Sequence, residues 1–316
     1  MTDKTRAQIE AMKTQTFGVE IEMYNITRED AAKAAAEYFG QPWKYEYTAA
    51  ANGYYTWSAY DRQGREWKFS RDASIRAAAD AQKCELVTPI LKYEDMELLQ
   101  GLVRHLRHNK AKSDPDHMCG IHVHVGADGH TPQTLRNLVN LMASKEDLII
   151  RALFIDRDRI DRYCRTVDPQ FLKEINEKKP RTMDALADVW YGAHHANYDR
   201  GAHYNESRYH MLNLHATFTK GTVEFRMFQF NNAHGKYKGG LHAGRVKAYV
   251  QFCLAVSQMA KQCRTCNPTQ PQDDNPKFAM RTWLIRCGFV GEEFNTAMKF
   301  FTQNLPGNAA WRTRVA

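Results

Sequence analysis

Glutamate and histidine residues stand at alternate positions of two short apolar segments. The segment TFGVEIEMYN places Glu20 and Glu22 between apolar residues, and CGIHVHVG does the same with His122 and His124. Successive side chains of a β-strand point to opposite faces of a sheet. Each segment is therefore predicted to be a strand with one apolar face and one face that carries carboxylates or imidazoles.

Two further segments carry the same kinds of residue. KCELVTPIL places Glu85 in an apolar setting, and GTVEFRMFQF places Glu224 and Arg226 on one strand face. Carboxylates that crowd on one face raise each other's pKa unless a cation neutralises them. Oxygen-rich ligation favours Mg²⁺ over zinc, with Mn²⁺ as the alternative. We therefore expect a site for two divalent cations, and an Arg side chain beside it indicates phosphoryl transfer.

The hydrophobic pattern also predicts the elements that hold these strands. A helix is expected from a Thr27 cap to Gly40, and another from Met96 to about Asn109. Further helices are expected after Pro132 and over residues 245–261, and the DRQG sequence is expected to be a turn between two strands. RYHMLNLHATF and GTVEFRMFQF are predicted to be antiparallel strands around a turn near Lys220 and Gly221.

The clean alternation of several strands indicates an α+β fold. One-sided burial is typical of an antiparallel sheet covered by helices on one face. The opposite face is expected to be open and to carry the carboxylates, histidines and Arg described above. Residues 156–206 are charged and poor in apolar periodicity, and we interpret them as an insertion.

Length and composition limit the remaining choices. The chain has 316 residues, 43% of them apolar and 25% charged, which excludes wholesale disorder. We interpret residues 1–316 as a single catalytic domain with a helical tail at 245–316. The net charge of +8 favours an anionic partner, either nucleic acid or a nucleotide polyphosphate. The absence of a membrane-length apolar run, the start without a signal sequence and the seven scattered cysteines predict a cytoplasmic protein.

The order of the motifs resembles the amidoligase family of the glutamine synthetase-like carboxylate–amine ligase superfamily. FGVEIE is followed by a D-x-S-I element at Asp72, by ELVTPIL, by CGIHVHVG and by GTVEFR. The matching elements run from about residue 16 to 228. This resemblance implies a curved, mainly antiparallel sheet of the glutamine synthetase catalytic-domain type, which binds ATP and two or three Mg²⁺ ions on its open face.

The resemblance also implies residue roles. The metal ligands would be Glu20, Glu22, Asp72, Glu85, His122 and Glu224. ATP would contact His124, Arg226 and Lys68. Arg208 and Asn213 would face the acyl substrate, and Arg208 and Arg226 would act in catalysis. The implied partners are a small-molecule or peptide carboxylate and an amine, and relatives of this kind often form homo-oligomers.

The implied reaction is stepwise. A substrate carboxylate attacks the γ-phosphorus of ATP, and an amine then displaces phosphate from the acyl phosphate to form an amide. Metal ions and Arg226 would stabilise charge on the transferring group. The sequence identifies neither substrate, nor the base that deprotonates the amine.

Two other functions stay open. A metal-dependent hydrolase would use His122 and His124 as a ligand pair that activates water, with bound zinc. A non-catalytic nucleic-acid-binding protein would explain the positive charge, although the basic residues are dispersed along the chain.

Overall fold

The computed structural model describes residues 1–49, 53–231, 240–270 and 274–310. The Gly-rich sequence NNAHGKYKGG at residues 231–240 predicts a loop, and most of it lies outside the described residues. The chain divides into two compact units, each treated separately below. Unit 1 combines residues 1–15, 124–227 and 248–316, and unit 2 combines residues 16–123 and 228–247. The single-domain interpretation of residues 1–316 stays a prediction.

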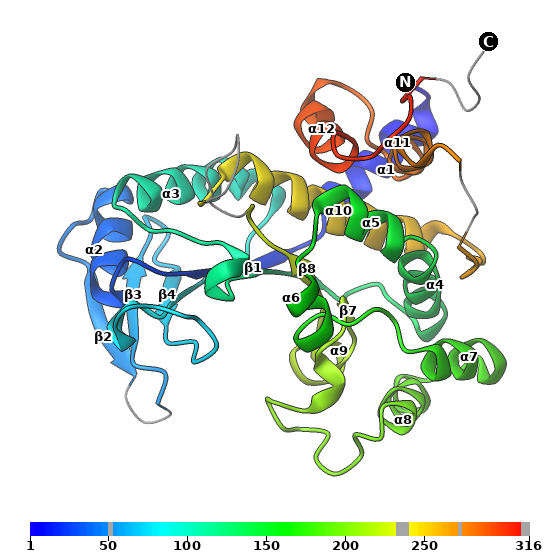
Figure 1. The fold of residues 1–316 in the computed structure, drawn as a ribbon, viewed down its shortest axis with the longest axis horizontal. Coiled ribbons are helices and arrows are strands. Elements are labelled where there is room, and N and C mark those ends of the chain that lie inside the picture. Colours follow the sequence, from blue (N-terminus) through cyan, green and yellow to red (C-terminus); the bar gives the residue numbers. More distant parts are fainter. Residues whose placement is uncertain (50–52, 232–239, 271–273, 311–316) are drawn as a thin grey trace. The chain divides into compact units, whose positions relative to one another are not determined.

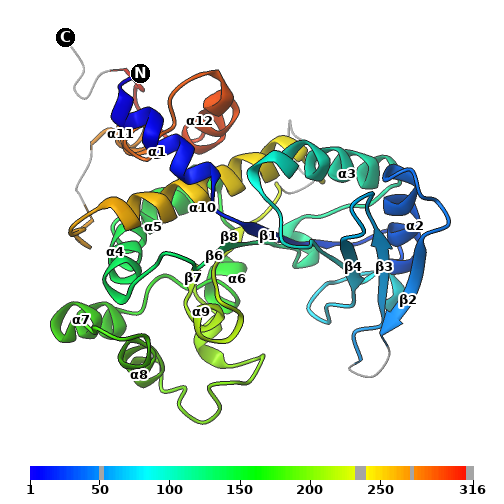
Figure 2. The ribbon, with the colours of Figure 1, turned by 180° about the vertical axis from the view of Figure 1, so that it is seen from behind.

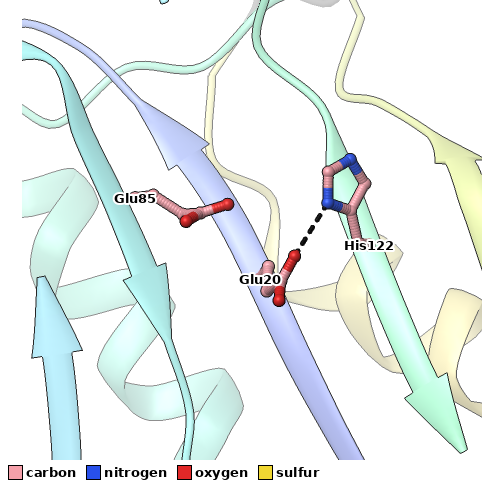
Figure 3. Close-up of side chains that lie close together, drawn as sticks. All are labelled: Glu20, Glu85 and His122. Carbon is pink, nitrogen blue, oxygen red and sulfur yellow. Dashed lines mark hydrogen bonds and ion pairs between the residues drawn. The ribbon is translucent and has the colours of Figure 1, made fainter. Parts of the chain in front are cut away.

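The predicted α+β class with an antiparallel sheet is confirmed. Among the described residues, eight strands are hydrogen-bonded in the order β2-β3-β4-β5-β1-β6-β8-β7 (Figure 1). The pairs β1–β5, β2–β3, β3–β4, β4–β5 and β7–β8 are antiparallel. Figure 3 shows β1 and β6 running in opposite directions as well. β6 (Ile121–Gly126) and β8 (Thr222–Phe228) each contribute residues to both units.

Unit 2 contains most of the strands. These are β1 (Phe17–Met23), β2 (Tyr45–Ala49), β3 (Thr56–Tyr60), β4 (Glu66–Ser70) and β5 (Cys84–Val87). The helices are α2 (Arg28–Tyr38) and α3 (Met96–His108), with the short turns η1 (Asp80–Gln82), η2 (Tyr93–Asp95) and η3 (Pro115–His117). α2 packs against β3, β4 and α3 (Figures 1 and 2).

The alternation in β1 is confirmed. Phe17, Val19, Ile21 and Met23 are all buried, because this face of the strand meets the apolar core. The predicted first helix also begins as expected, since the Thr27 side chain accepts a hydrogen bond from the backbone N–H of Asp30. Gly40, with φ of 73°, follows the end of that helix in the left-handed conformation that glycine adopts easily.

The hairpin of β3 and β4 is held by a buried carboxylate. Asp61 accepts hydrogen bonds from Arg65 Nε at 2.8 Å and from Trp67 Nε1 at 3.0 Å. The same guanidinium donates from Nη1 and Nη2 to the two carboxylate oxygens of Asp95, at 2.8 and 2.9 Å. Burial raises the pKa of Asp61, but the hydrogen bonds from Trp67 and Arg65 outweigh it and hold that pKa below its usual range. The turn therefore depends on an ionised carboxylate.

Unit 1 is mainly helical. Its elements are α1 (Asp3–Lys13), α4 (Pro132–Ala143), α5 (Glu146–Leu153), α6 (Arg157–Arg162), α7 (Pro169–Lys178), α8 (Met183–Ala193), η4 (Glu206–Arg208), β7 (Leu212–Asn213), α9 (His215–Lys220), most of α10 (Ala243–Gln262), α11 (Pro276–Arg286), η5 (Glu292–Phe294) and α12 (Asn295–Thr302). Figure 2 shows α1 beside α11 in this unit. Among the described residues, none of the helices has both the length and the apolar character needed to span a bilayer.

The segment 156–206 is more regular than its composition suggested. It contains α6, α7 and α8, and α7 packs against α8 through an edge-to-face contact of Phe171 and Trp190 at 4.9 Å between ring centroids. The helices α6 and α7 were missed because each one buries few apolar side chains, whereas α8 buries five residues. In α7, only Phe171 and Ile175 are buried.

The predicted strand over RYHMLNLHATF is confirmed at Leu212 and Asn213 and is otherwise wrong, since Arg208 belongs to η4. Only Leu212 and Asn213 pair with β8, and the residues from His215 to Lys220 form α9 instead. The Asn213 side chain accepts a hydrogen bond from the backbone N–H of His215, which turns the chain into the helix. Gly221, with φ of 67°, ends the helix.

Candidate active site

The strand register in unit 2 places predicted site residues directly opposite one another on neighbouring strands. Glu22 on β1 lies directly opposite Glu85 on β5, which in turn lies opposite Ser70 on β4. Directly opposite residues of antiparallel strands share a face of the sheet, with their Cβ atoms about 5 Å apart. The next row contains Glu20 and Lys68, with Val87 between them. Lys68 is half-exposed and pairs with Glu66 at 3.3 Å.

One acidic cluster joins this face to a loop. Glu22, Asp72 and Glu85 each offer a carboxylate oxygen, and these three atoms lie within 4.8 Å of one another. Asp72 is in the loop after β4, where its Oδ1 accepts hydrogen bonds from the backbone N–H and the hydroxyl of Ser74, at 2.7 and 2.6 Å. The D-x-S sequence thus forms a local turn that fixes the Asp72 carboxylate.

A second cluster shares one of these carboxylates. Glu20, Glu85 and His122 also offer ligand atoms within 4.8 Å of one another. His122 Nδ1 contacts Glu20 Oε2 at 2.9 Å, and Figure 3 shows the Glu20 carboxylate turned toward His122, with Glu85 extending toward Glu20 from the other neighbouring strand. Glu85 therefore belongs to both clusters.

A backbone N–H and an imidazole lie beside the Glu22 carboxylate. The backbone N–H of Gly120 donates to Glu22 Oε2, and His122 Nε2 lies 4.0 Å from Glu22 Oε1. Glu22 is 5% exposed and His122 is 4% exposed, so the expectation of an open face is wrong at these two positions. The face is more accessible at Glu85 and Lys68.

The donor set of unit 2 fits divalent cations. Crowded carboxylates repel one another at this spacing, and a cation removes the repulsion. Carboxylate oxygens are the ligands that Mg²⁺, Ca²⁺ and Mn²⁺ prefer, and one imidazole is compatible with Mn²⁺. The two clusters are therefore compatible with divalent metal binding.

In unit 1, the predicted residues gather around Glu224. Asn213 Nδ2 donates to Glu224 Oε2 at 2.6 Å, and Arg226 Nη1 donates to Glu224 Oε1 at 2.5 Å. His124 Nε2 lies 3.7 Å from the latter oxygen, while His124 Nδ1 contacts Thr222 Oγ1 at 2.9 Å. Glu224 is 1% exposed and Arg226 is 4% exposed, so the prediction of an open face is wrong here too.

The two predicted arginines of this unit share an aromatic neighbour. The guanidinium carbon of Arg226 lies 5.8 Å from the centroid of the Tyr209 ring, and that of Arg208 lies 5.7 Å from it. Arg208 also lies over Tyr204 and donates to the backbone oxygen of His203 at 2.7 Å. The tyrosines hold both guanidiniums by cation–π contact. The sequence motifs did not indicate these tyrosines, and the abundance of Tyr near residue 206 was the available signal.

Comparison with known proteins identifies the family. The family model described as "Putative amidoligase enzyme" matches residues 13–257. The chain belongs to this amidoligase family. The match covers most of the chain, as the resemblance of its motifs predicted, and extends beyond the expected residues at both ends.

The other two comparisons do not narrow the function further. A crystal structure of a bifunctional glutathione synthetase from Pasteurella multocida is similar to this chain with 13% identity and a TM-score of 0.46. The alignment covers 96% of this chain and 49% of the synthetase chain, so this amidoligase-family chain spans about half the length of that structure. A comparison with curated proteins found no match.

Proposed function

We propose that the chain is an ATP-dependent carboxylate–amine ligase that forms an amide through an acyl phosphate. The observation that carries this proposal is the pair of acidic clusters that share Glu85, in a chain that belongs to the amidoligase family. We also assign the fold to the glutamine synthetase-like superfamily, with a curved sheet.

The proposed metal ions are Mg²⁺, with Mn²⁺ as the substitute. One ion would bind Glu22, Asp72 and Glu85, and another would bind Glu20, Glu85 and His122; two or three ions are proposed in all. Glu224 stays a proposed ligand. When bound, such ions would neutralise phosphate oxygens and offset the charge that develops during phosphoryl transfer.

The proposed nucleotide contacts come from basic side chains. Arg226, His124 and Lys68 would contact ATP, and Arg226 would bind the γ-phosphate. The Arg226 guanidinium is already oriented by Glu224 and Tyr209, so little side-chain entropy would be lost when phosphate binds. Rigid, pre-oriented charge is what stabilises a transition state most effectively.

The proposed acyl-substrate contacts need one revision. Arg208 keeps its proposed role, because a guanidinium pairs well with a carboxylate. Asn213 already uses its amide nitrogen on Glu224 and its amide oxygen on the N–H of His215. We therefore propose that Asn213 positions Glu224, and that its contact with substrate is secondary.

The proposed reaction has two steps. A carboxylate oxygen of the acid bonds to the γ-phosphorus, and the bond between that phosphorus and the β,γ-bridging oxygen breaks to release ADP. The amine nitrogen then bonds to the acyl carbon, and the bond from that carbon to the phosphate oxygen breaks. Free carboxylates acylate poorly, so the phosphate leaving group drives the second step.

The test is ATP turnover with a panel of acids. Purified protein with Mg·ATP should release ADP only when the correct acid is present, and mass spectrometry should detect an amide product once the amine is added. ADP release without any amide product, across amino acids and peptides, would contradict the ligase.

The two alternatives make different predictions. A hydrolase based on His122 and His124 requires zinc. His122 instead shares its cluster with two carboxylates, Glu20 and Glu85, and oxygen-rich ligation favours Mg²⁺ or Mn²⁺ over zinc. Stoichiometric zinc in the purified protein would support it over the ligase. A nucleic-acid-binding protein requires affinity for DNA or RNA that falls steeply with salt.

A further inference from the structure

A carboxylate–imidazole pair lies in the loop that precedes β6. Asp114 Oδ1 contacts His117 Nδ1 at 2.8 Å and also accepts the backbone N–H of His117 at 3.1 Å. Asp114 is 2% exposed, whereas the His117 side chain is 39% exposed. The imidazole is therefore anchored to a buried group and remains accessible to a ligand.

The hydrogen bond selects the tautomer of this imidazole. An ionised carboxylate only accepts hydrogen bonds, so Nδ1 of His117 carries the hydrogen and Nε2 carries the lone pair. The other oxygen of Asp114 accepts the hydroxyl of Tyr24 at 2.6 Å.

Tyr24 also fixes the plane of the imidazole. The rings of Tyr24 and His117 are stacked, with centroids 3.6 Å apart and planes 12° apart. Tyr24 follows Glu22 by two residues and extends β1 through a backbone bridge with Lys112. Two residues along a strand span roughly 6.6 Å, so His117 stacks on the next side chain of the face that carries Glu20 and Glu22.

The backbone ties His117 to the acidic clusters from two sides. The N–H of Arg76, in the loop of Asp72, donates to the carbonyl of His117 at 2.9 Å. Three residues after His117, the N–H of Gly120 donates to Glu22. One short loop thus carries the Gly120 N–H, which bonds to the acidic cluster, and the His117 imidazole, whose Nε2 holds the lone pair.

We propose that Nε2 of His117 is the base that takes a proton from the attacking amine, a role that rests on the ligase function proposed above. At neutral pH an alkylamine is an ammonium ion without a lone pair. Its first proton passes to Nε2, which forms an imidazolium ion; the freed lone pair then bonds to the acyl carbon. The second nitrogen proton leaves with the phosphate, and the imidazolium returns its proton to solvent.

Asp114 and Tyr24 are positioning residues in this scheme. Asp114 stabilises the imidazolium and holds the tautomer, as a buried carboxylate does for the histidine of a serine protease. The ionisable groups around Tyr24 are Asp114, Asp116 and Cys119.

The experiment compares two nucleophiles. Protein, Mg·ATP and a mixture of the protein amino acids as acids are supplied with hydroxylamine, which is neutral at pH 7, or with methylamine, which is protonated. His117→Gln should lower methylamide formation about 100-fold or more, the usual effect of a general base, and leave hydroxamate formation unchanged. Free imidazole should restore methylamide formation in His117→Ala. Asp114→Asn should lower methylamide formation and shift its pH profile. His108→Gln, at an exposed position on α3, is the matched control and should change neither product.

The outcomes separate the two proposals. A wild-type protein that forms neither product contradicts the ligase, and the base with it. A wild-type protein that forms hydroxamate at pH 7 but forms methylamide only at high pH, where methylamine is itself neutral, has no base for a protonated amine and contradicts the role of His117 alone. Equal loss of both products in His117→Gln, with normal folding by circular dichroism, also overturns that role.

Discussion

Glu22 and Glu85 lie directly opposite each other on the antiparallel strands β1 and β5 of unit 2. Like charges in this arrangement destabilise a sheet. Their persistence in a face that also holds Asp72 within 4.8 Å has a simple explanation if a divalent cation is part of the working protein. Because Glu85 belongs to both clusters, it is the most informative position for testing metal binding.

Glu85→Gln should separate stability from metal binding. Without metal, the variant should be more stable than wild type, because one of the repelling charges is gone. With Mn²⁺, wild type should gain thermal stability by mass action, while the variant should bind the ion at least about 10-fold more weakly and gain less. Thermal unfolding with and without Mn²⁺ measures both effects. Glu94→Gln, at an exposed position, is the control, and a Glu85 variant that behaves like it would contradict the metal site.

Asn213→Ala should destabilise unit 1 through Glu224. The substitution removes a donor from a buried carboxylate, which costs about 1–3 kcal/mol. Asn304→Ala is a matched control, because its amide donates at 2.8 Å to a neutral acceptor, the carbonyl of Ala152, and its loss should cost less. Urea unfolding gives both values. Asn213→Asp should be worse than Asn213→Ala, since it places a second charge beside Glu224, and the reverse order would contradict this account.

Glu146 should make the protein less stable as the pH rises. Burial raises the pKa of this carboxyl from 4.5 to about 7, although the N–H of Val167 donates to it and lowers the value in part. A raised folded-state pKa contributes stability that is fully present below pH 4.5 and is lost as the pH rises through 7. The shift corresponds to about 3 kcal/mol.

The test of that prediction is Glu146→Gln, which keeps an acceptor for Val167 and removes the ionisation. The difference in unfolding free energy between variant and wild type should move by about 3 kcal/mol in favour of the variant between pH 4.5 and pH 8. Glu177→Gln, at an exposed position on α7, should show no such trend. A difference that does not change with pH would refute the buried ionisation.

The hairpin of unit 2 should lose stability in acid. Despite burial, hydrogen bonds from Trp67 and Arg65 hold the pKa of Asp61 below its usual range, and those from Arg65 do the same for Asp95. A lowered carboxyl pKa contributes stability above pH 3.8 that is lost as the pH falls through the folded-state pKa, which is the opposite sign to Glu146. Arg65→Lys keeps the charge but cannot donate to both oxygens of Asp95 in the planar geometry of a guanidinium. The loss of unfolding free energy in this variant should therefore be largest near pH 7 and should shrink below pH 3.8. Unfolding at both pH values checks this, and a cost independent of pH would contradict it.

The sequence was a good guide to the strands of unit 2. Alternation alone gave the faces of β1 and β6, because a side-chain period of two is set by strand geometry. The gathering of Glu20, Glu85 and His122 was predicted for the same reason, although they are far apart in the chain. The resemblance to the amidoligase family supplied Asp72, which no periodicity marks.

Other features depend on contacts between distant segments and could not be predicted in this way. The burial of Glu22 requires the N–H of Gly120, and the position of Arg226 requires Tyr209. α9 stands where a strand was predicted, and the side chain of Asn213 accepts the backbone N–H of its first residue, His215. The pairing of Asp114 with His117 was also missed, since neither residue belongs to a regular strand or helix pattern.

In the proposed reaction, a substrate carboxylate receives a phosphoryl group from ATP. The most direct measurement uses the acid found in the panel, labelled with ¹⁸O in its carboxylate, together with Mg·ATP and the amine. The account predicts that the released inorganic phosphate carries one labelled oxygen and that ADP is formed in equal amount. Unlabelled phosphate, or AMP and pyrophosphate in place of ADP, would contradict it.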